Sequence, residues 1–508
     1  MSDTVLEAIE PEVAECELLD MDTICIDPYW AMRVPASLAL RRQVLPFACV
    51  DGQVYVACAD SADRSTLEAV ERSLRRPICA LQAECGSLRR ALDRVFDGNL
   101  AVAGSPSGPR VRIDPVAEPD SEGAVGICDE LLHAAIVRQA SDIHLDPNEQ
   151  ETVVRLRVDG VLEKYRTLPA AIHGSVISRL KVQSGLDIAE KRAPQDGRFT
   201  HTFGPTKQKI DIRVATLPTQ FGERMTLRLL ALQTESLTLE RLGMSPRDLE
   251  GFSQAIAKPH GLILLTGPTG SGKSTTLYAA LRRIVAQEPQ NVITIEDPIE
   301  YHIDGVAQVE VDSADKVSFN KALRSVLRHD PDVVMIGEIR DAETADVAIK
   351  ASLTGHLVLS TLHTNSAASA ITRLLDMGTD RFLIAATIRL AVAQRLVRRL
   401  CMRCRRPRPL AESEALAIGF LEAAGTTVYD AGGCMYCADR GYVGRLGLFE
   451  MLPFDESLSR LVAEGGGEGD VIRAARKRNV PRLSDDALAK LHAGETTVKE
   501  VLEAVTVW

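Results

Sequence analysis

The feature that most constrains the fold of this chain is a glycine-rich turn that joins an apolar run to an amphipathic helix. It reads Gly261-Leu-Ile-Leu-Leu-Thr-Gly-Pro-Thr-Gly-Ser-Gly-Lys-Ser-Thr-Thr276. The apolar run predicts a short buried strand, and a helix that begins near Lys273 directs its positive end at the turn. Glycines leave room for backbone N–H groups to wrap an anion such as a triphosphate. The sequence therefore predicts a phosphate-binding loop.

The residues of this loop predict how a nucleotide would be held. The Lys273 ammonium would reach the β- and γ-phosphates of ATP, and the Ser274 hydroxyl would coordinate Mg²⁺. At average residue usage the pattern arises by chance in roughly 1–2% of chains this long, and the flanking strand and helix make a chance match rarer still. The predicted nucleotide-binding residues are Gly267, Pro268, Thr269, Gly270, Ser271, Gly272, Lys273, Ser274 and Thr275.

Three further short apolar runs each end in polar residues. The runs and the residues that follow them are 292–295 with Glu296–Glu300, 333–336 with Glu338, and 357–360 with His363. Parallel sheets gather ligand-binding residues at the carboxyl ends of their strands in this way. We therefore expect an α/β fold with a doubly wound parallel sheet, in which Glu338 polarises a water or supports Mg²⁺.

The 508-residue chain is too long for a single hydrophobic core. An acidic lead over roughly residues 1–30 is expected to be flexible, and strand and helix patterns from Val44 onward predict a small α+β domain. The predicted parts are an N-terminal α+β domain (1–97), a linker (98–122), a second α+β domain (123–235), the α/β nucleotide-binding core (236–400), a four-cysteine metal-binding subdomain (401–450) and a helical C-terminal subdomain (451–508).

Arginines alternate with apolar residues in the predicted strands of the second domain. Arg155, Arg157 and Arg213 fall on the side of the sheet that faces away from the core. From these residues alone, a solvated charged face is the favoured interpretation.

Composition and hydropathy exclude several classes of protein. A net charge of −11 and an aromatic content of 4% disfavour nucleic-acid binding, which uses clustered cations and stacking rings. The N-terminus shows no secretory-signal pattern, and we find no uncharged apolar run of about 18 residues. The best candidate, residues 382–397, contains Arg389 and Arg395 and predicts a packed helix. We expect a cytosolic protein whose membrane association runs through partners.

Two C-x-x-C pairs predict a metal site. Cys401 and Cys404 form the first pair, and Cys434 and Cys437 form the second. Four thiolates favour tetrahedral Zn²⁺ in a structural role, although the long spacing leaves a redox pair or inert buried thiols open. The surrounding arginines, interpreted equally well as a partner-facing patch or a solvated face, are Arg395, Arg398, Arg399, Arg403, Arg405, Arg406 and Arg408.

Four of these segments resemble the signature boxes of the secretion-superfamily ATPases. The boxes are Gly267–Ser274, Glu296–Glu300, Ile336–Glu338 and Leu353–Thr364. The family that the chain resembles most is that of the type II secretion ATPases, component E of the general secretion pathway, over residues 30–508. The resemblance implies a P-loop NTPase core of RecA-like fold, a preceding PAS-like α+β domain and a four-cysteine zinc insertion.

The resemblance also implies roles for individual residues. Glu300 matches the acidic-box carboxylate that orients the attacking water, Glu338 ends the Walker B strand, and His363 is the histidine-box residue near the γ-phosphate. Arg198 and Arg213 match arginines that reach the nucleotide from the preceding domain, which reverses the solvated-face interpretation for Arg213. Mobile guanidinium groups stabilise the charge of phosphoryl transfer and couple domain closure to it. Arg324 and Arg328 resemble a second basic pair.

The implied function is an ATP-hydrolysing motor that assembles the pseudopilus and exports folded proteins. The family forms a homo-oligomer, usually a hexamer, at the inner membrane, with the cytoplasmic domains of L-type and F-type secretion components as partners. ATP, Mg²⁺ and Zn²⁺ are the implied cofactors. An assembly ATPase of type IV pili or of a competence pseudopilus is the close alternative, and a nucleic-acid translocase or a scaffold without turnover is a more distant one.

Overall fold

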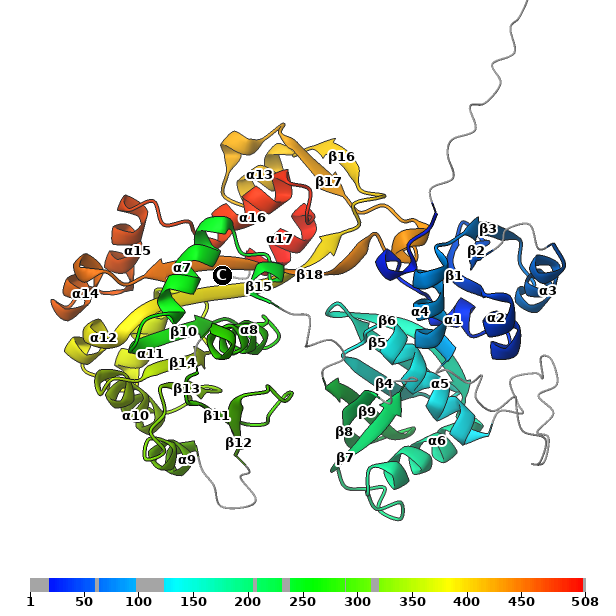
Figure 1. Ribbon diagram of the computed structural model, residues 1–508, viewed down its shortest axis with the longest axis horizontal. Helices are drawn as coiled ribbons and strands as arrows, with labels where there is room; N and C mark the ends of the chain where they lie inside the picture. The colour runs from blue at the N-terminus through cyan, green and yellow to red at the C-terminus, as the bar shows by residue number, and fades with distance from the viewer. Residues whose placement is uncertain are drawn as a thin grey trace, which may run out of the picture. The chain divides into compact units, whose positions relative to one another are not determined.

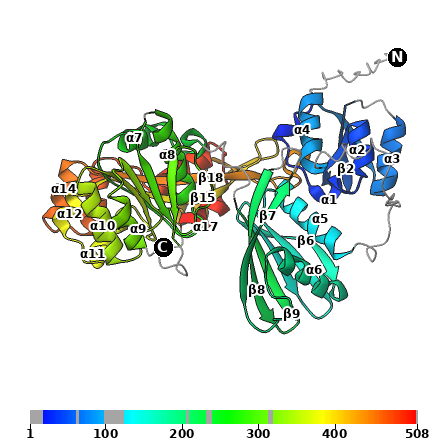
Figure 2. The same cartoon turned by 60° about the horizontal axis from the view of Figure 1, so that its bottom comes forward.

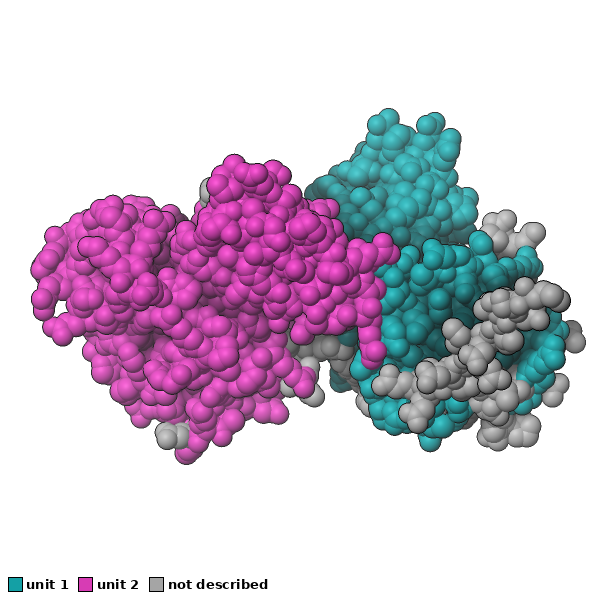
Figure 3. Space-filling model, turned by 90° about the horizontal axis from the view of Figure 1, so that it is seen from above, with its two compact units in different colours: residues 1–229, 433–441 teal, residues 230–432, 442–508 magenta. Residues whose placement is uncertain are grey.

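We analysed a computed structural model, in which the described residues are 18–59, 64–96, 123–203, 208–230, 238–287, 289–311 and 319–505. They form two compact units, which are described separately below (Figure 3). Unit 1 comprises residues within 1–229 together with 433–441, and unit 2 comprises 230–432 and 442–508. The predicted linker at 98–122 and the first 17 residues of the acidic lead lie outside the described residues.

The described N-terminal part of unit 1 is a three-stranded sheet, in the order β1-β2-β3, packed against helices. Its elements are α1 (Pro28–Ala31), α2 (Ala36–Arg42), β1 (Val44–Val50), β2 (Gln53–Cys58), α3 (Arg64–Leu74), β3 (Ile78–Gln82) and α4 (Cys85–Phe96). The lead predicted to be flexible up to residue 30 is already folded from residue 18. Met21 is fully buried in this core, and Asp22 forms an ion pair with Arg90 of α4.

The second domain of unit 1 contains a six-stranded sheet in its described residues, in the order β6-β5-β4-β9-β8-β7, with α5 and α6 packed against each other. Its elements are α5 (Ala124–Val137), β4 (Asp142–Pro147), β5 (Glu151–Val158), β6 (Val161–Pro169), α6 (Ala170–Gln183), β7 (Gln195–Phe203), β8 (Gln208–Thr219) and β9 (Gly222–Leu230). Along β5 buried and half-buried residues alternate, which confirms that Arg155 and Arg157 lie on the side away from the core.

Unit 2 is built on a sheet that has seven strands in its described part, in the order β12-β11-β13-β14-β10-β15-β18. The pairs up to β10–β15 are parallel, and β18 joins the edge antiparallel. The strands are β10 (Gly261–Thr266), β11 (Val292–Glu296), β12 (Val306–Glu310), β13 (Val333–Ile336), β14 (Leu357–Leu362), β15 (Ile388–Leu400) and β18 (Tyr442–Pro453). The predicted parallel sheet is confirmed, and its core strands are β10, β11, β13 and β14.

Helices cover both faces of this sheet (Figure 1, Figure 2). Ile263 and Leu265 of β10 pack in one hydrophobic cluster with residues of α7 and α8, whereas Leu262 and Leu264 pack in another with residues of α9 to α12. A strand buried on both faces is apolar throughout, as the sequence predicted. These helices are α7 (Pro246–Ile256), α8 (Lys273–Gln287), α9 (Phe319–Val326), α10 (Ala342–Leu353), α11 (Ser369–Asp376) and α12 (Arg381–Thr387).

The packed helix predicted over residues 382–397 is wrong beyond Thr387. There α12 ends, and the chain continues as the 13-residue strand β15, which lies between β10 and β18. Leu390 and Val392 pack on one face of the sheet, and Ala391 and Ala393 pack on the other. A strand buried on both faces has no period-2 pattern, so hydrophobicity alone could not distinguish it from a buried helix.

The helices of the predicted C-terminal subdomain divide between two hydrophobic clusters. Residues of α14 (Glu456–Ala463) and α15 (Glu468–Lys477) pack with α10 to α12 in the cluster beneath the central sheet. Residues of α16 (Leu483–His492) and α17 (Val498–Val505) pack instead with the region that contains α13 (Glu412–Ala417) and the two-stranded sheet of β16 (Arg406–Pro409) and β17 (Thr427–Asp430). In the part of the chain that the structure describes, no helix combines the length and apolar character that a membrane crossing requires.

Candidate nucleotide site and four-cysteine centre

The glycine-rich loop runs from the end of β10 to the start of α8, and its three glycines are required for two different reasons. Gly267, Gly270 and Gly272 all have positive φ, at 147°, 81° and 87°. A Cβ at Gly267 would lie 2.5 Å from the backbone oxygen of Gln394, and one at Gly272 would lie 2.8 Å from the Nε2 atom of Gln394. Two of the glycines therefore allow the loop to pack against β15, whereas a Cβ at Gly270 meets nothing within 4 Å in the described structure.

Lys273, the first residue of α8, folds back over the loop. Its Nζ donates to the carbonyl oxygens of Gly267 at 2.8 Å and Pro268 at 3.0 Å, and only 8% of the residue is exposed. Burial lowers the pKa of Lys273 to about 8, although the negative charge of Glu338 acts in the opposite direction. The ammonium thus lies inside the loop that a phosphate would enter, where a cation is most useful to an anion.

Two hydroxyl groups of the loop have properties that fit a ligand. Ser274 is exposed at the N-terminus of α8, where backbone N–H groups favour anions and a hydroxyl can reach a hydrated cation. The buried Ser271 Oγ has no hydrogen-bond partner among the described residues. Buried hydroxyls are normally satisfied, so this atom fits a role in holding a bound group. The neighbouring Thr276 donates to the side-chain oxygen of Gln394 at 2.9 Å, which anchors α8 to β15.

Glu338 and His363 meet at the carboxyl end of the sheet. Glu338 follows β13 and His363 follows β14. The Glu338 carboxylate lies 3.1 Å from the Nε2 atom of His363. The same carboxylate forms a close ion pair with Arg340, and its side chain is 16% exposed. Hydrogen bonding to Glu338 raises the pKa of Arg340. Because β13, β14 and β10 are neighbouring parallel strands, the loop, the carboxylate and the imidazole lie at the same edge of the sheet, and the charge of Glu338 acts on Lys273.

Glu296, the last residue of β11 and the first of the acidic segment, is a structural carboxylate. It is 4% exposed and accepts hydrogen bonds from the side chains of Thr294 at 2.5 Å and Gln308 at 3.1 Å, and also from the Tyr278 hydroxyl. The Tyr278 hydroxyl in turn accepts from the backbone N–H of Glu300 at 3.2 Å. Tyr278 lies on α8, so the helix that starts at the glycine-rich loop also fixes the backbone of Glu300, whose side chain is exposed.

The four predicted arginines are divided between the two units, Arg198 and Arg213 in unit 1 and Arg324 and Arg328 in unit 2. Arg198 of β7 and Arg213 of β8 are direct partners across the antiparallel pair in unit 1, so both side chains leave the same face of the sheet. Arg324 of α9 forms an exposed ion pair with Glu343 of α10, and Arg328 follows the end of α9 on the surface.

The structure adds residues to the site that sequence reasoning missed. Arg395 is 5% exposed and donates to the carbonyl oxygens of Gln394 at 3.0 Å and Asn365 at 2.9 Å. A Cβ at Gly267 would lie 3.1 Å from the Nη1 atom of Arg395, so a buried guanidinium borders the loop. Burial lowers the pKa of Arg395. An arginine within an apolar run was the available signal, because unpaired arginines are rarely buried.

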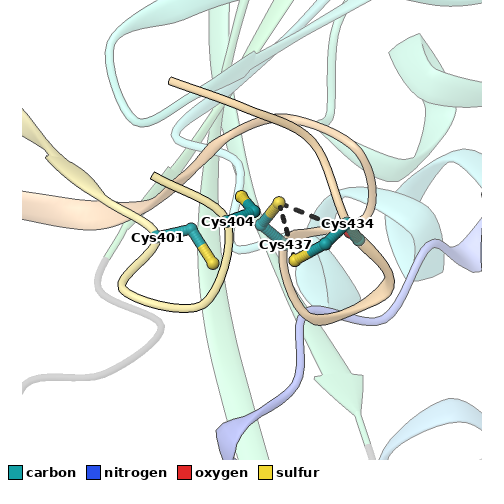
Figure 4. Close-up of side chains that lie close together, drawn as sticks. All are labelled: Cys401, Cys404, Cys434 and Cys437. Carbon is teal, nitrogen blue, oxygen red and sulfur yellow. Dashed lines mark hydrogen bonds between the residues drawn. The ribbon is translucent and has the colours of Figure 1, made fainter. Parts of the chain in front are cut away.

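The four predicted cysteines come together (Figure 4). Their Sγ atoms all lie within 4.8 Å of one another, and those of Cys434 and Cys437 are 3.8 Å apart. Sulfurs placed about 2.3 Å from a tetrahedral zinc ion are themselves about 3.8 Å apart, so this pair has the required spacing. The backbone N–H of Gly441 donates to the Cys437 sulfur at 3.1 Å, which suits a thiolate ligand. The donor set therefore fits Zn²⁺.

Most arginines around the cysteines are engaged within the protein. Arg395 of β15 borders the glycine-rich loop, and Arg398 forms an ion pair with Glu500 at 2.6 Å. Arg405 stacks on Tyr429 and donates to the backbone carbonyls of Ala493 and Gly494, just after α16. Arg408 forms ion pairs with Glu414 and Asp430. These four are accounted for by internal contacts, which corrects the prediction that the whole set forms either a partner patch or a solvated face.

Solved structures define the class of this fold. The X-ray structure of the ATPase DotB from Legionella pneumophila is 25% identical, with a TM-score of 0.57, and the match covers 77% of this chain and 98% of DotB. The crystal structure of the pilus retraction motor PilT with bound ADP is 27% identical, with a TM-score of 0.51, and the match covers 74% of this chain and 96% of PilT. The chain therefore has the α/β ATPase fold of these proteins.

Sequence relatives narrow the class to a family. The model for the type II/IV secretion system protein matches residues 118–503, and that for the MshEN domain matches residues 14–102. Type II secretion system protein E of Pseudomonas aeruginosa is 42% identical over 92% of this chain and 95% of its own length. The type IV pilus assembly ATPase PilB of Myxococcus xanthus is 38% identical over 96% of this chain and 88% of its own length. The chain belongs to the type II/IV secretion system protein family, which confirms the predicted resemblance.

Proposed function

We propose that this protein is the ATP-hydrolysing motor of a type II secretion system, coupling turnover to pseudopilus assembly and to export of folded proteins. The observation that carries this proposal is the convergence of Lys273, Glu338 and His363 at the carboxyl end of a parallel sheet, in a chain that aligns with protein E over nearly its full length. Ligands of open α/β sheets bind at this edge. We also propose that the core is a RecA-like P-loop domain and that the second α+β domain is PAS-like.

The loop residues Gly267 to Thr275 would bind the nucleotide phosphates. Lys273 would exchange its two carbonyl acceptors for phosphate oxygens, which carry full negative charge and interact with an ammonium more strongly. Ser274 would hold Mg²⁺, which supplies charge neutralisation at the phosphates when bound. Preorganised cations and N–H groups in such a site stabilise charge that develops in the transition state.

The two acidic residues would divide the remaining tasks. Glu338 is held by His363 and Arg340, so its carboxylate is fixed in direction, as a group that polarises water must be. We assign to Glu300 the orientation of the attacking water, and its backbone is fixed by Tyr278. His363 would sense the γ-phosphate through the same carboxylate.

Arg198 and Arg213 would stabilise phosphoryl transfer from the second domain, with Arg324 and Arg328 as a second basic pair. Like charges directly opposite on neighbouring strands destabilise a sheet, so the pairing of Arg198 with Arg213 suggests a functional demand for an anion. We propose that the protein acts as a homo-oligomer, a hexamer as in the family pattern.

We place the motor in the cytoplasm, peripheral to the inner membrane, with L-type and F-type secretion components as partners. The test is steady-state ATP turnover by the purified full chain. We expect turnover to rise severalfold with anionic vesicles plus the cytoplasmic domain of an L-type component, and to stay at its basal rate with single-stranded DNA. Stimulation by DNA alone would instead support a nucleic-acid translocase.

Nucleotide affinity should depend on the protonation of Lys273. Phosphates favour the ammonium, so affinity is full below the pKa of about 8 in the free protein and falls as pH rises through it. Linkage predicts a loss of roughly tenfold in affinity between pH 7 and pH 9. Equilibrium titration with a fluorescent ADP analogue measures this. In Lys273→Arg, whose guanidinium keeps its proton, the remaining affinity should be flat over the same range, and a flat profile in the unaltered protein would contradict the assignment.

Assembly of a type IV pilus is the second candidate, favoured by the PilB relative that covers 96% of this chain. The two functions share the ATPase core and differ in the membrane partner. Capture of the full chain by the cytoplasmic domain of an L-type secretion component, against capture by its pilus counterpart, separates them.

A further inference from the structure

The second cysteine pair lies in a segment that packs against the N-terminal domain of unit 1. We call residues 434–440 the docking turn; its short helix η5 (Met435–Cys437) is the orange turn beside the blue domain in Figure 1. The backbone N–H of Cys25 donates to the carbonyl oxygen of Tyr436 at 2.9 Å. Met435 and Tyr436 also pack against the hydrophobic core of the N-terminal domain. The residues between the two cysteines are therefore the ones that contact this domain.

Arg440 ties the other end of the docking turn to both domains of unit 1. Its Nε donates to the carbonyl oxygen of Cys437 at 3.3 Å, and its Nη1 lies 3.8 Å from the carboxylate of Asp159, in the turn between β5 and β6. Its side chain also interacts with the thiol of Cys25. A separate ion pair between Asp27 and Arg138 of α5 connects the two domains directly. The docking turn is thus one of at least two connections that hold the N-terminal domain.

The docking turn adopts a backbone conformation that requires outside support. Ala438 and Asp439 have positive φ values of 49° and 62°, and a Cβ at Gly433 would clash with the Asp439 carboxylate. Residues other than glycine rarely adopt this backbone region, and they persist there where the surroundings over-determine them. A three-residue helix supplies little of that support itself. A metal ion on Cys434 and Cys437 would fix both ends of the contacting residues.

We propose that metal binding by the four cysteines controls docking of the N-terminal domain on the docking turn. The proposal rests on the zinc site proposed from the cysteine geometry, and it adds a role for that site. With zinc bound, the turn presents the Tyr436 carbonyl to Cys25 and the Met435 side chain to the domain core. Without zinc, the turn relaxes, and the domain keeps only its connections to α5, including Asp27 with Arg138.

Hydrogen exchange of the full chain, measured by mass spectrometry alongside its zinc content, tests this proposal. The chain is compared as purified, after removal of zinc by a chelator, and after zinc is restored. We expect about one zinc per chain, and on its removal about tenfold faster exchange in the peptide that contains the Cys25 amide, reversed by zinc. The Val54 amide, which donates to Pro77 within the same domain at 2.9 Å, is the internal control and should not change.

Two variants separate the metal from the contact. Cys401→Ser removes a ligand outside the docking turn and should reproduce the zinc-free exchange pattern. Met435→Asp keeps all four thiols and the zinc but should expose the Cys25 amide. Zinc loss without faster exchange at the Cys25 amide would overturn the proposal, and so would an equal loss of protection at the Val54 amide. If Cys401→Ser fails to fold, the comparison before and after chelation of the unaltered chain decides between these outcomes. A folded chain that never contains zinc would reject the metal site itself, which distinguishes the two failures.

Discussion

Replacement of Lys273 by alanine is expected to abolish ATP turnover. The ammonium is the cation buried inside the glycine-rich loop, and its removal takes from the loop the positive charge that would contact the phosphates. Loss of one preorganised charged donor at a reacting phosphate costs about 10²–10³-fold in turnover. Phosphate release by the purified chain measures the rate, and a fluorescent ADP analogue measures the accompanying loss of affinity.

Lys350→Ala is the matched control for this substitution. Lys350 lies on α10 of the same unit, is 63% exposed and forms a surface ion pair with Asp346. Such pairs contribute at most about 1 kcal/mol, so stability and turnover should hardly change. Turnover by Lys273→Ala within a few-fold of the unaltered chain would remove the loop from the proposed mechanism.

The second large effect is expected for Glu338→Gln, which should retain ATP but hydrolyse it slowly. Glutamine has the shape of glutamate without its charge, so the loop and Lys273 can still bind phosphates. The site loses the carboxylate that His363 and Arg340 hold in place. Removal of a positioned acid or base typically costs 10²–10⁴-fold. Single-turnover hydrolysis and the nucleotide content of the purified variant measure the two properties separately.

An exposed glutamate provides the comparison for Glu338→Gln. Glu456 lies at the start of α14 with its side chain 90% exposed, and Glu456→Gln should hydrolyse ATP at the unaltered rate. Joint loss of binding and turnover in Glu338→Gln would reassign the carboxylate to nucleotide binding. Unchanged turnover would exclude it from the site.

The convergence of Lys273, Glu338 and His363 could be predicted because it follows from the backbone. Glu338 and His363 closely follow strands that the sequence indicates by short apolar runs. Lys273 follows such a strand after the glycine-rich loop. Parallel strands place their carboxyl ends on one edge, so order along the chain is enough to bring such residues together. The four cysteines were predictable for a related reason, since each C-x-x-C spacing already defines half of a metal site.

The contacts of Gln394 and Arg395 with the glycine-rich loop could not be predicted, because they depend on which strand lies beside β10. The apolar run that contains them has no period that separates a strand from a buried helix, and the helix predicted there removed both residues from the loop. Met435 and Tyr436 contact the N-terminal domain, which lies about 400 residues earlier in the sequence. No local pattern records such a partner. The hydrogen bonds by which Tyr278 links Glu296 to Glu300 could likewise not be predicted from the sequence.

The close fit of the glycine-rich loop against Gln394 bears on how degenerate relatives of this ATPase would be recognised. A pseudoenzyme that kept the fold but lost ATP would still need glycine at positions 267 and 272, because side chains there collide with β15. At Gly270 only the left-handed backbone opposes substitution, at about 1–2 kcal/mol. In a relative that no longer hydrolyses ATP, we therefore expect substitutions at positions 270 and 273 before substitutions at positions 267 and 272.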